Sequence, residues 1–174
     1  MTSGDPAPGT GTVAEAEFTS AMSRFATGVT VVTVADGRDD IGSTISAFAS
    51  ISVDPPLVMV SVTATSYVTE VIDRQRRFAV NVLRERHRAI AGRFAAEGRP
   101  SARLLLANEP HHRGEHSGAL VLDEALVSLE CAVTERVAAG DHVVYLAAVT
   151  AIPVAGALGE APLIRYAGRY RALG

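Results

Sequence analysis

Small hydroxyl side chains are concentrated in one stretch of the chain, residues 42–60, which reads GSTISAFASISVDPPLVMV. A buried hydroxyl group without a hydrogen-bond partner costs about 1–3 kcal/mol, so these side chains must either face water or bind something. Pro55 and Pro56 have no N–H to donate to a sheet and therefore indicate a turn or bulge. Backbone amides and hydroxyls at such a turn could bind an anion or a heterocycle. The alternative is an ordinary strand–turn–strand with solvated serines, which composition alone favours.

Two other polar side chains stand in apolar surroundings where they need a partner. Asn81 interrupts the run FAVNVL (78–83), and its amide must be satisfied within the protein or by a ligand. His142 follows Gly140 and Asp141 at a turn between two apolar segments. His142 could cap the turn by hydrogen-bonding the backbone, or it could contact a ligand. Asp141 could orient the His142 ring through a ring N–H, or it could only stabilise the turn. The residues alone leave both questions open and favour the structural roles for His142 and Asp141.

The histidines and the cysteine do not predict a metal site. His111, His112 and His116 lie in a segment rich in Gly, Pro and Arg, without the regular spacing of metal ligands. The single cysteine, Cys131, excludes an intramolecular disulfide and a cysteine metal cluster. It sits in an alternating strand pattern, where we expect a small core residue rather than a redox thiol.

Strands at hairpin spacing dominate the pattern of the whole chain. Segments 126–137 and 142–154 flank a Gly-containing turn and predict a long antiparallel hairpin. A second hairpin is predicted around Asp36-Gly37, and Ser66 is expected to cap a short helix. The other expected elements are helices over 13–24 and 85–97 and strands over 57–62, 78–83 and 162–170. Without βαβ units, GxGxxG or a Walker sequence, the fold class is mainly β with some α, an antiparallel barrel with a few short helices.

The composition bounds the class of protein. The 174 residues suffice for one domain, expected over residues 13–174, and residues 1–12 (MTSGDPAPGTGT) are expected to form a disordered tail. The net charge is −3 and all sixteen basic residues are arginine, which argues against a nucleic-acid partner and suits a discrete phosphate. No apolar run reaches the ~18–20 residues that cross a bilayer. The N-terminus does not resemble a secretory signal, so we expect a cytoplasmic protein without membrane contact.

Six segments together resemble the short-chain flavin reductases that serve two-component monooxygenases. The segments are 25–33 (FATGVTVVT), 42–60, 78–83, 126–131 (LVSLEC), 140–149 (GDHVVYLAAV) and 162–170 (PLIRYAGRY), and they follow the order of that family. The resemblance covers nearly all of the chain after residue 12. It implies an FMN-binding split β-barrel with short flanking helices.

The resemblance further implies an activity and partners. In this family NADH or NADPH reduces FMN or FAD, and the reduced flavin passes to a separate monooxygenase, which is a transient partner. It also implies a homodimer with flavin bound near the subunit boundary. The choice between NADH and NADPH and between FMN and FAD stays open, as does the shape of the nucleotide entrance near His111–His116.

Particular residues receive roles from the same resemblance. Those matching the part that hydrogen-bonds the flavin ring and ribityl chain are Thr44, Ile45, Ser46, Ala47, Ser50, Ile51 and Ser52. Those expected along the isoalloxazine ring are Asn81, Val82 and Leu83. Many relatives have serine or threonine in place of Ala47, so one hydrogen bond to flavin is expected to be missing or to come from the backbone.

The remaining carried-over positions concern the phosphate and the nicotinamide. Ser66 matches a serine that helps to hold the flavin phosphate. Arg169 and Tyr170 match a closing pair that contacts flavin or nucleotide. His142 resembles the histidine near the nicotinamide, and we assign it as the catalytic residue, acting by contact rather than as a general acid.

Two other functions would use the same barrel. One is a self-contained flavoenzyme acting on a different substrate, and the other is a flavin-binding protein without turnover. Oxidation of NADH that depends on added free flavin distinguishes the reductase from both.

Overall fold

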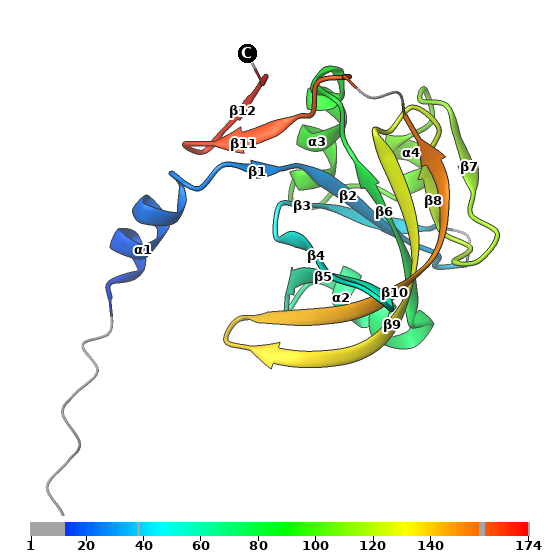
Figure 1. Cartoon of the computed structure of the whole chain (residues 1–174), viewed down its shortest axis with the longest axis horizontal. Helices are drawn as coiled ribbons and strands as arrows, with labels where there is room; N and C mark the ends of the chain where they lie inside the picture. Colours follow the sequence, from blue (N-terminus) through cyan, green and yellow to red (C-terminus); the bar gives the residue numbers. More distant parts are fainter. Residues whose placement is uncertain (1–12, 38, 157–158, 174) are drawn as a thin grey trace, which may run out of the picture.

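The computed structural model describes residues 13–37, 39–156 and 159–173. Its centre is an antiparallel sheet of seven strands in the order β3-β2-β6-β9-β10-β5-β4 (Figure 1). The strands are β2 (Thr30–Val34), β3 (Ile41–Ile45), β4 (Phe48–Val53), β5 (Pro56–Thr63), β6 (Arg77–Val82), β9 (Val127–Ala139) and β10 (His142–Ala155). The predicted tail over residues 1–12 lies outside the described residues.

The sheet curls into a barrel because two strands that follow one another in the chain lie at its opposite edges. β3 is the first strand of the sheet and β4 is the last. The chain crosses between these edges through Ser46 and Ala47, and the Ser61 amide donates to the Ala47 carbonyl at 3.0 Å. This crossing confirms the predicted antiparallel barrel. It also means that the hydroxyl-rich stretch is two strands joined by a bend, rather than one extended segment.

Alternation along β2 divides the interior into two cores. Val32 and Val34 belong to the cluster inside the barrel, whereas Val31 belongs to a second cluster outside it. All five residues of β2 are buried, as its β-branched sequence TVVTV favours. Its two threonines are satisfied in place, since Thr30 Oγ1 donates to the Ile45 carbonyl at 2.7 Å and Thr33 Oγ1 to the Leu120 carbonyl at 2.5 Å.

Two helices cover the two cores. α2 (Tyr67–Gln75) contributes Val68, Val71 and Ile72 to the first cluster, and α3 (Arg88–Ala95) contributes Ile90, Ala91 and Phe94 to the second. Phe94 can pack on β3 only because residue 42 is glycine. A Cβ on Gly42 would stand 2.7 Å from the Phe94 ring and 2.9 Å from the Val32 carbonyl oxygen. Gly42 therefore sets how closely α3 approaches β3.

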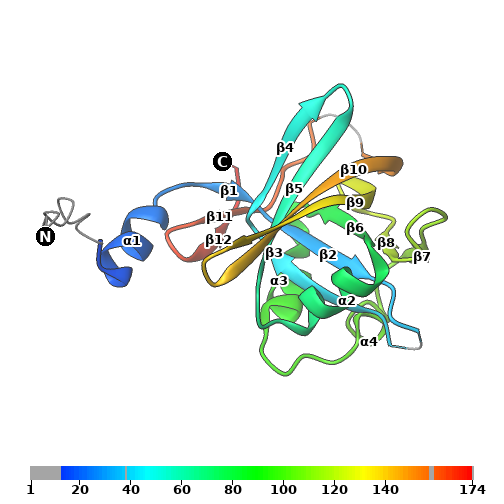
Figure 2. The ribbon, with the colours of Figure 1, turned by 90° about the horizontal axis from the view of Figure 1, so that it is seen from below.

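The smaller elements lie at the rim of the barrel. They are α1 (Glu15–Met22), β1 (Thr27–Gly28), the 3₁₀ turn η1 (Glu85–His87), α4 (Ala102–Leu105), β7 (His111–Arg113), β8 (Leu120–Leu122), β11 (Ile164–Tyr166) and β12 (Arg169–Arg171). β1, β11 and β12 form a separate sheet, and β7 pairs with β8. α1 stands away from the body of the molecule, and the β4–β5 hairpin projects from that body in another direction (Figure 2). No helix in the described part of the chain is long and apolar enough to span a bilayer.

Most predicted elements are present with small differences. The long hairpin is β9 and β10, and Ser66 caps α2 by accepting from the Val68 amide at 3.3 Å. The helix expected over 85–97 is a 3₁₀ turn followed by α3, and the helix expected over 13–24 is α1. The segment 162–170, predicted as one strand, is the hairpin β11–β12, because Ala167 and Gly168 both adopt positive φ angles. Part of the predicted histidine-rich loop pairs with β8 as β7.

Candidate active site

Ten residues line a cleft of about 180 Å³ at the point where β3 passes into β4. The ends of β5 and the starts of α2 and β10 form the rest of its wall. The lining residues are Ser43, Thr44, Ile45, Ser46, Ala47, Ser61, Val62, Thr63, Ser66 and His142. No carboxylate is among them, and most are small, so a planar polar ligand can approach the backbone.

Three backbone contacts bring these distant segments together. The Ser61 amide bonds the Ala47 carbonyl at the barrel closure, as described above. The register of β5 and β10 pairs Thr63 with His142. The Ser66 amide donates to the Thr63 carbonyl at 3.0 Å, which places the start of α2 beside both. The cleft is therefore a product of barrel closure.

The structure brings together many of the predicted site residues. Those on the cleft are Thr44, Ile45, Ser46, Ala47, Ser66 and His142. Sequence reasoning missed Ser61, Val62 and Thr63, and it included Ser43 only as part of the hydroxyl-rich stretch 42–60. The alternation of Ser61 and Thr63 with the buried Val60 and Val62 could have shown that both hydroxyls share one face of β5, but not that this face meets β3.

The hydroxyls on the cleft differ in what they can still donate. Thr44 Oγ1 donates to the Ala91 carbonyl at 2.7 Å, so this hydroxyl is committed to α3. Ser66 Oγ accepts from the Val68 amide and keeps its own proton available. Ser46 is half-buried at the bend. Ser46 and Ser66 thus keep a hydroxyl proton that could be donated to a ligand, and Thr44 serves to hold the cleft wall on α3.

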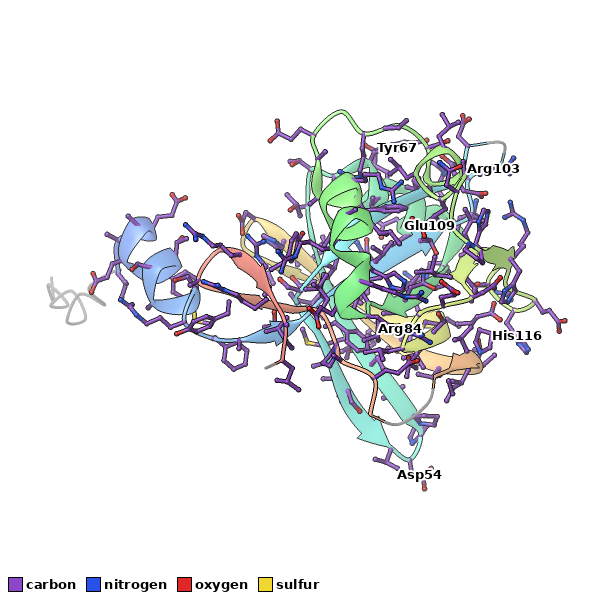
Figure 3. All side chains as sticks on the ribbon, turned by 90° about the horizontal axis from the view of Figure 1, so that it is seen from above. Asp54, Tyr67, Arg84, Arg103, Glu109 and His116 are labelled. Carbon is purple, nitrogen blue, oxygen red and sulfur yellow. The ribbon has the colours of Figure 1, made fainter. Side chains whose placement is uncertain are left out.

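Ser50, Ile51 and Ser52 do not line this cleft. They lie on β4 with a β-bulge between Ser50 and Ser52, and the Ile51 side chain is 49% exposed. Figure 3 shows Asp54, at the tip of the same hairpin, on the side of the molecule opposite Tyr67 at the start of α2. Within a single chain these three residues are therefore not on the wall of the cleft that the other predicted contacts line.

Asn81 is satisfied inside the protein, which was the alternative that the sequence left open. Its Nδ2 donates to the Val31 and Leu120 carbonyls at 3.2 and 3.4 Å. Its Oδ1 accepts from the Leu122 amide and from Ser128 Oγ, both at 2.8 Å. These four bonds use the full capacity of the amide, and only 1% of Asn81 is exposed. In the single chain this side chain has no polar group left to offer an isoalloxazine ring, which favours the structural role.

Val82 and Leu83, which follow Asn81 in the chain, differ in how deeply they are buried. Leu83 is fully buried in the second core cluster, so its side chain packs on protein and not along a ring. Val82 is half-buried at the end of β6. We keep Val82 as a proposed contact and leave the side chains of Asn81 and Leu83 out of the site.

His142 and Asp141 form a pair at the start of β10. His142 Nδ1 lies 2.8 Å from Asp141 Oδ1, and the hydrogen bond with His142 lowers the pKa of Asp141. An ionised carboxylate can only accept, so Nδ1 carries the proton and Nε2 remains for a ligand. Asp141 therefore orients the ring. It also stabilises the turn through its carbonyl, which accepts from the Ala64 amide at 2.9 Å.

Arg169 and Tyr170 lie on β12, apart from the cleft. Arg169 is exposed, and Tyr170 packs against the second core cluster. The Arg165 guanidinium lies 5.6 Å from the centre of the Tyr170 ring, and Arg88 Nη2 donates to the Tyr170 carbonyl at 3.1 Å. In the single chain this pair does not meet the other predicted contacts.

Metal and thiol chemistry have no support in the described residues. No group of three or more His, Cys, Asp or Glu side chains is placed there to hold a metal ion. Cys131 is 1% exposed, and burial raises its pKa to about 12. It is a core residue, as predicted, and not a redox thiol.

A second cleft of about 220 Å³ adjoins the first and shares Ser66 with it. Small-molecule sites typically measure about 300–1,000 Å³. Each cleft alone is smaller than this, but the described residues on their walls include hydroxyl groups and a guanidinium and no carboxylate, a donor set that fits a flavin nucleotide. A larger and open cleft between α1 and the β11–β12 turn contains none of the predicted side chains.

A family model described as flavin reductase like domain matches residues 22–174. The chain belongs to this family. The match spans the whole barrel, the cleft and β11–β12, so the family expected from the six segments is confirmed.

Individual relatives agree with the family. The chain is 38% identical over 157 residues to an NADH-dependent FMN reductase from Streptomyces nodosus subsp. asukaensis, covering 90% of this chain and 84% of that one. It is 34% identical to the reductase component of a 4-hydroxyphenylacetate 3-monooxygenase from Thermus thermophilus, covering 90% and 95%. The structure of an NADH:FAD oxidoreductase from Streptomyces globisporus, in complex with NAD and FAD fragments, superimposes with a TM-score of 0.83 at 29% identity, covering 91% and 92%.

Proposed function

We propose that this flavin reductase family member uses NADH or NADPH to reduce free FMN or FAD and supplies the reduced flavin to a separate monooxygenase. One observation carries the proposal: barrel closure gathers Ser46, Ser66 and His142 on one carboxylate-free cleft. The relatives named above support it, since one is an FMN reductase and another is the reductase component of a monooxygenase.

The protein's own contribution to this reaction is position and electrostatics. The flavin and the nicotinamide supply the redox chemistry when both are bound. Holding two reactants at contact distance removes up to about 7–11 kcal/mol of entropic cost in ideal cases, so no strong acid or base is required. The cleft accordingly contains none, and Ser46 and the backbone of the bend are placed to stabilise negative charge on a reduced ring.

His142 has the role of positioning the nicotinamide. Its ring is held through Nδ1 by Asp141 and is 41% exposed at the mouth of the cleft. A ring that is fixed at one nitrogen and open at the other can pack against a bound nucleotide without reorganising. Ser66, at the other end of the cleft, is the proposed contact for the flavin phosphate.

We expect the active form to be a homodimer. α1 has no buried residue in the single chain, and Phe18, Met22 and Phe25 are 60%, 47% and 65% exposed. A second copy of the chain is the occupant that would bury this surface. Dimerisation would also explain how Ser50, Ile51, Arg169 and Tyr170, which are separated from the cleft here, contact a flavin bound near the subunit boundary.

One assay tests the proposed function directly. Protein freed of flavin is mixed with NADH or NADPH, and nucleotide oxidation is followed with riboflavin, FMN and FAD in turn. We expect oxidation that depends on added flavin and saturates at micromolar concentration, which corresponds to about 8 kcal/mol of binding. Such affinity allows the reduced product to leave.

Other results of this assay would replace the proposal. Retention of tightly bound flavin that is reduced without exchange would indicate a self-contained flavoenzyme. Tight flavin binding without oxidation of either nucleotide would indicate a binding protein.

A further inference from the structure

The wall of the second cleft includes a cationic side chain, Arg99, to which the proposed reaction assigns no role. This cleft lies between β3, the first turn of α2 and the loop that follows α3, and Arg99 on that loop forms part of its wall together with Gly42, Ser66 and Tyr67. No Asp or Glu lines it. Among the described residues on its wall Arg99 is therefore the one charged side chain, and Ser66 is shared with the first cleft.

The Arg99 side chain is held in place but keeps most of its donors. Nε donates to the Gly42 carbonyl at 2.7 Å and Nη1 donates to the Ala96 carbonyl at 3.2 Å. Arginine has five N–H donors, so these two bonds leave three. The backbone is also constrained on both sides, since Gly98 has a φ of +62° and Pro100 is locked by its ring. The guanidinium is thus held in place, and three of its N–H groups have no partner among the described residues.

Two arginines near Arg99 in the sequence form ion pairs with a carboxylate. Arg93 pairs with Glu109 at 2.8 Å and Arg103 pairs with Asp40 at 2.8 Å. Among the described residues Arg99 has no such ion pair, although it is half-buried and burial lowers its pKa. A partly desolvated cation without an anionic partner is costly, and a bound anion would offset that cost.

The identity of the anion follows from the shared wall. Ser66 borders both clefts, so a ligand whose ring lies beside Ser46 and His142 extends past Ser66 toward Arg99. In a flavin nucleotide the group at that end is the 5′-phosphate. A guanidinium matches a phosphate through two parallel N–H bonds, which the three remaining donors of Arg99 permit.

We propose that Arg99 binds the 5′-phosphate of the flavin nucleotide and thereby makes the enzyme favour FMN and FAD over riboflavin. The inference rests on the proposed function for the position of the ring, and it adds a specificity residue to that site. Arg99 does not touch the reacting atoms, so its effect is on flavin binding and not on the rate at saturation.

The test compares flavins with and without the phosphate. We expect Arg99→Gln to raise the Kd for FMN roughly tenfold, as measured by quenching of flavin fluorescence, while the Kd for riboflavin changes less than about twofold. Arg99→Lys should recover part of the FMN affinity. The matched control is Arg77→Gln, which removes the same charge from an exposed position on β6.

Two results with Arg99→Gln would overturn the proposal. Equal weakening of FMN and riboflavin binding would indicate that Arg99 only supports the cleft wall. A raised KM for NADPH with unchanged KM for NADH and unchanged FMN affinity would assign Arg99 to the 2′-phosphate of the nucleotide instead. Absence of any flavin-dependent turnover by the unmodified protein would remove the proposed function, whereas the binding measurements would still decide whether Arg99 reads a phosphate.

A measurement on the unmodified protein keeps the test independent of how the variants fold. Inorganic phosphate should compete with FMN and leave riboflavin binding unchanged. Competition against both flavins, or against neither, would contradict a phosphate site at Arg99.

Discussion

The pair of His142 and Asp141 is the residue-scale device most specific to the proposed chemistry. Because Asp141 holds Nδ1, the orientation of the ring does not depend on a bound ligand. We predict that His142→Ala raises the KM for NADH or lowers kcat by about tenfold, corresponding to about 1.4 kcal/mol, and changes FMN affinity much less. Steady-state kinetics with both substrates, together with flavin fluorescence, measure this difference.

Asp141→Asn provides the matched comparison for His142→Ala. It keeps the side-chain volume and the turn but weakens the hold on the ring, so we expect a smaller effect in the same direction. Unchanged steady-state kinetics in His142→Ala would contradict the positioning role and leave turn capping as the function of this residue.

Asn81 shows how a polar residue in the middle of a strand can serve stability alone. Its four hydrogen bonds connect β6 to β2, β8 and β9. Asn81→Ala leaves the Leu122 amide and the Ser128 hydroxyl without their acceptor, and each unsatisfied buried group costs about 1–3 kcal/mol. We predict a loss of about 2–4 kcal/mol in the free energy of unfolding by urea, with flavin KM unchanged in the folded protein.

Asn108, which is exposed beyond α4, is the control for Asn81. Asn108→Ala should leave the urea midpoint in place. A large increase in flavin KM for Asn81→Ala, without loss of stability, would restore the ligand role that its burial argues against.

At the scale of the elements, Asp40 ties the β2–β3 turn to α4 and β7. Its side chain is fully buried and accepts from Arg103 Nε at 2.8 Å and from Arg113 Nη2 at 2.7 Å. Burial acts to raise the pKa of Asp40, but the hydrogen bonds from Arg113 and Arg103 outweigh it and hold the pKa below the ordinary value. The structure therefore favours the ionised form of this carboxyl.

A lowered pKa makes this contribution to stability depend on pH with a definite sign. The stabilisation is fully present above the pKa of an unfolded Asp, about 3.9, and is lost as the pH falls through the lower pKa of the folded protein. We predict that Asp40→Asn lowers the free energy of unfolding by about 1.5–3 kcal/mol at pH 7. The loss should shrink as the pH falls below about 4.

Urea unfolding from pH 7 down to pH 3 measures this effect. The pKa of Glu130 is also lowered, because hydrogen bonds from Ser117 and the His116 amide outweigh its burial, so its contribution to stability is also lost on acidification. Comparison of Asp40→Asn with the unmodified protein isolates the contribution of Asp40. If the difference in unfolding free energy between the two proteins stays constant from pH 7 to pH 3, the ionisation of Asp40 does not contribute to stability. The prediction would then be wrong.

At the scale of the whole molecule, α1 is the part whose packing a single chain leaves incomplete. Phe18 and Met22 on α1 and Phe25 just after it are exposed in the single chain, so we predict that the protein is a dimer in solution and that Phe18→Asp shifts it toward monomer. Sedimentation or size-exclusion chromatography over a range of concentrations measures the change. The fold should survive, since α1 contributes no buried residue to the chain's own core.

Leu104 on α4 is the control for Phe18, because it is 68% exposed and lies on another part of the surface. Leu104→Asp should leave the oligomeric state unchanged. A dimer that persists in Phe18→Asp and Met22→Asp would place the subunit contact elsewhere, with the free edge of β4 as the next surface to test.

The sequence by itself determined the elements and the family. The alternation of β9 and β10, the cap at Ser66 and the proline pair after β4 are local properties, since side-chain direction in a strand and the needs of a helix start are set within a few residues. Local signals placed Ser46 in the hydroxyl-rich stretch, whereas the site roles of Ser66 and His142 came from the resemblance to the family.

Only the tertiary structure decided which polar side chains remain free to bind. Thr44 is committed to Ala91, Asn81 is committed to residues in β2, β8 and β9, and Arg99 has no anionic partner in the part of the chain that the structure describes. Their partners lie tens of positions away in the chain, and the barrel closure that unites them involves strands at opposite ends of the sheet. Hydrogen-bond satisfaction depends on these non-local contacts, so no local pattern of residues could have revealed it.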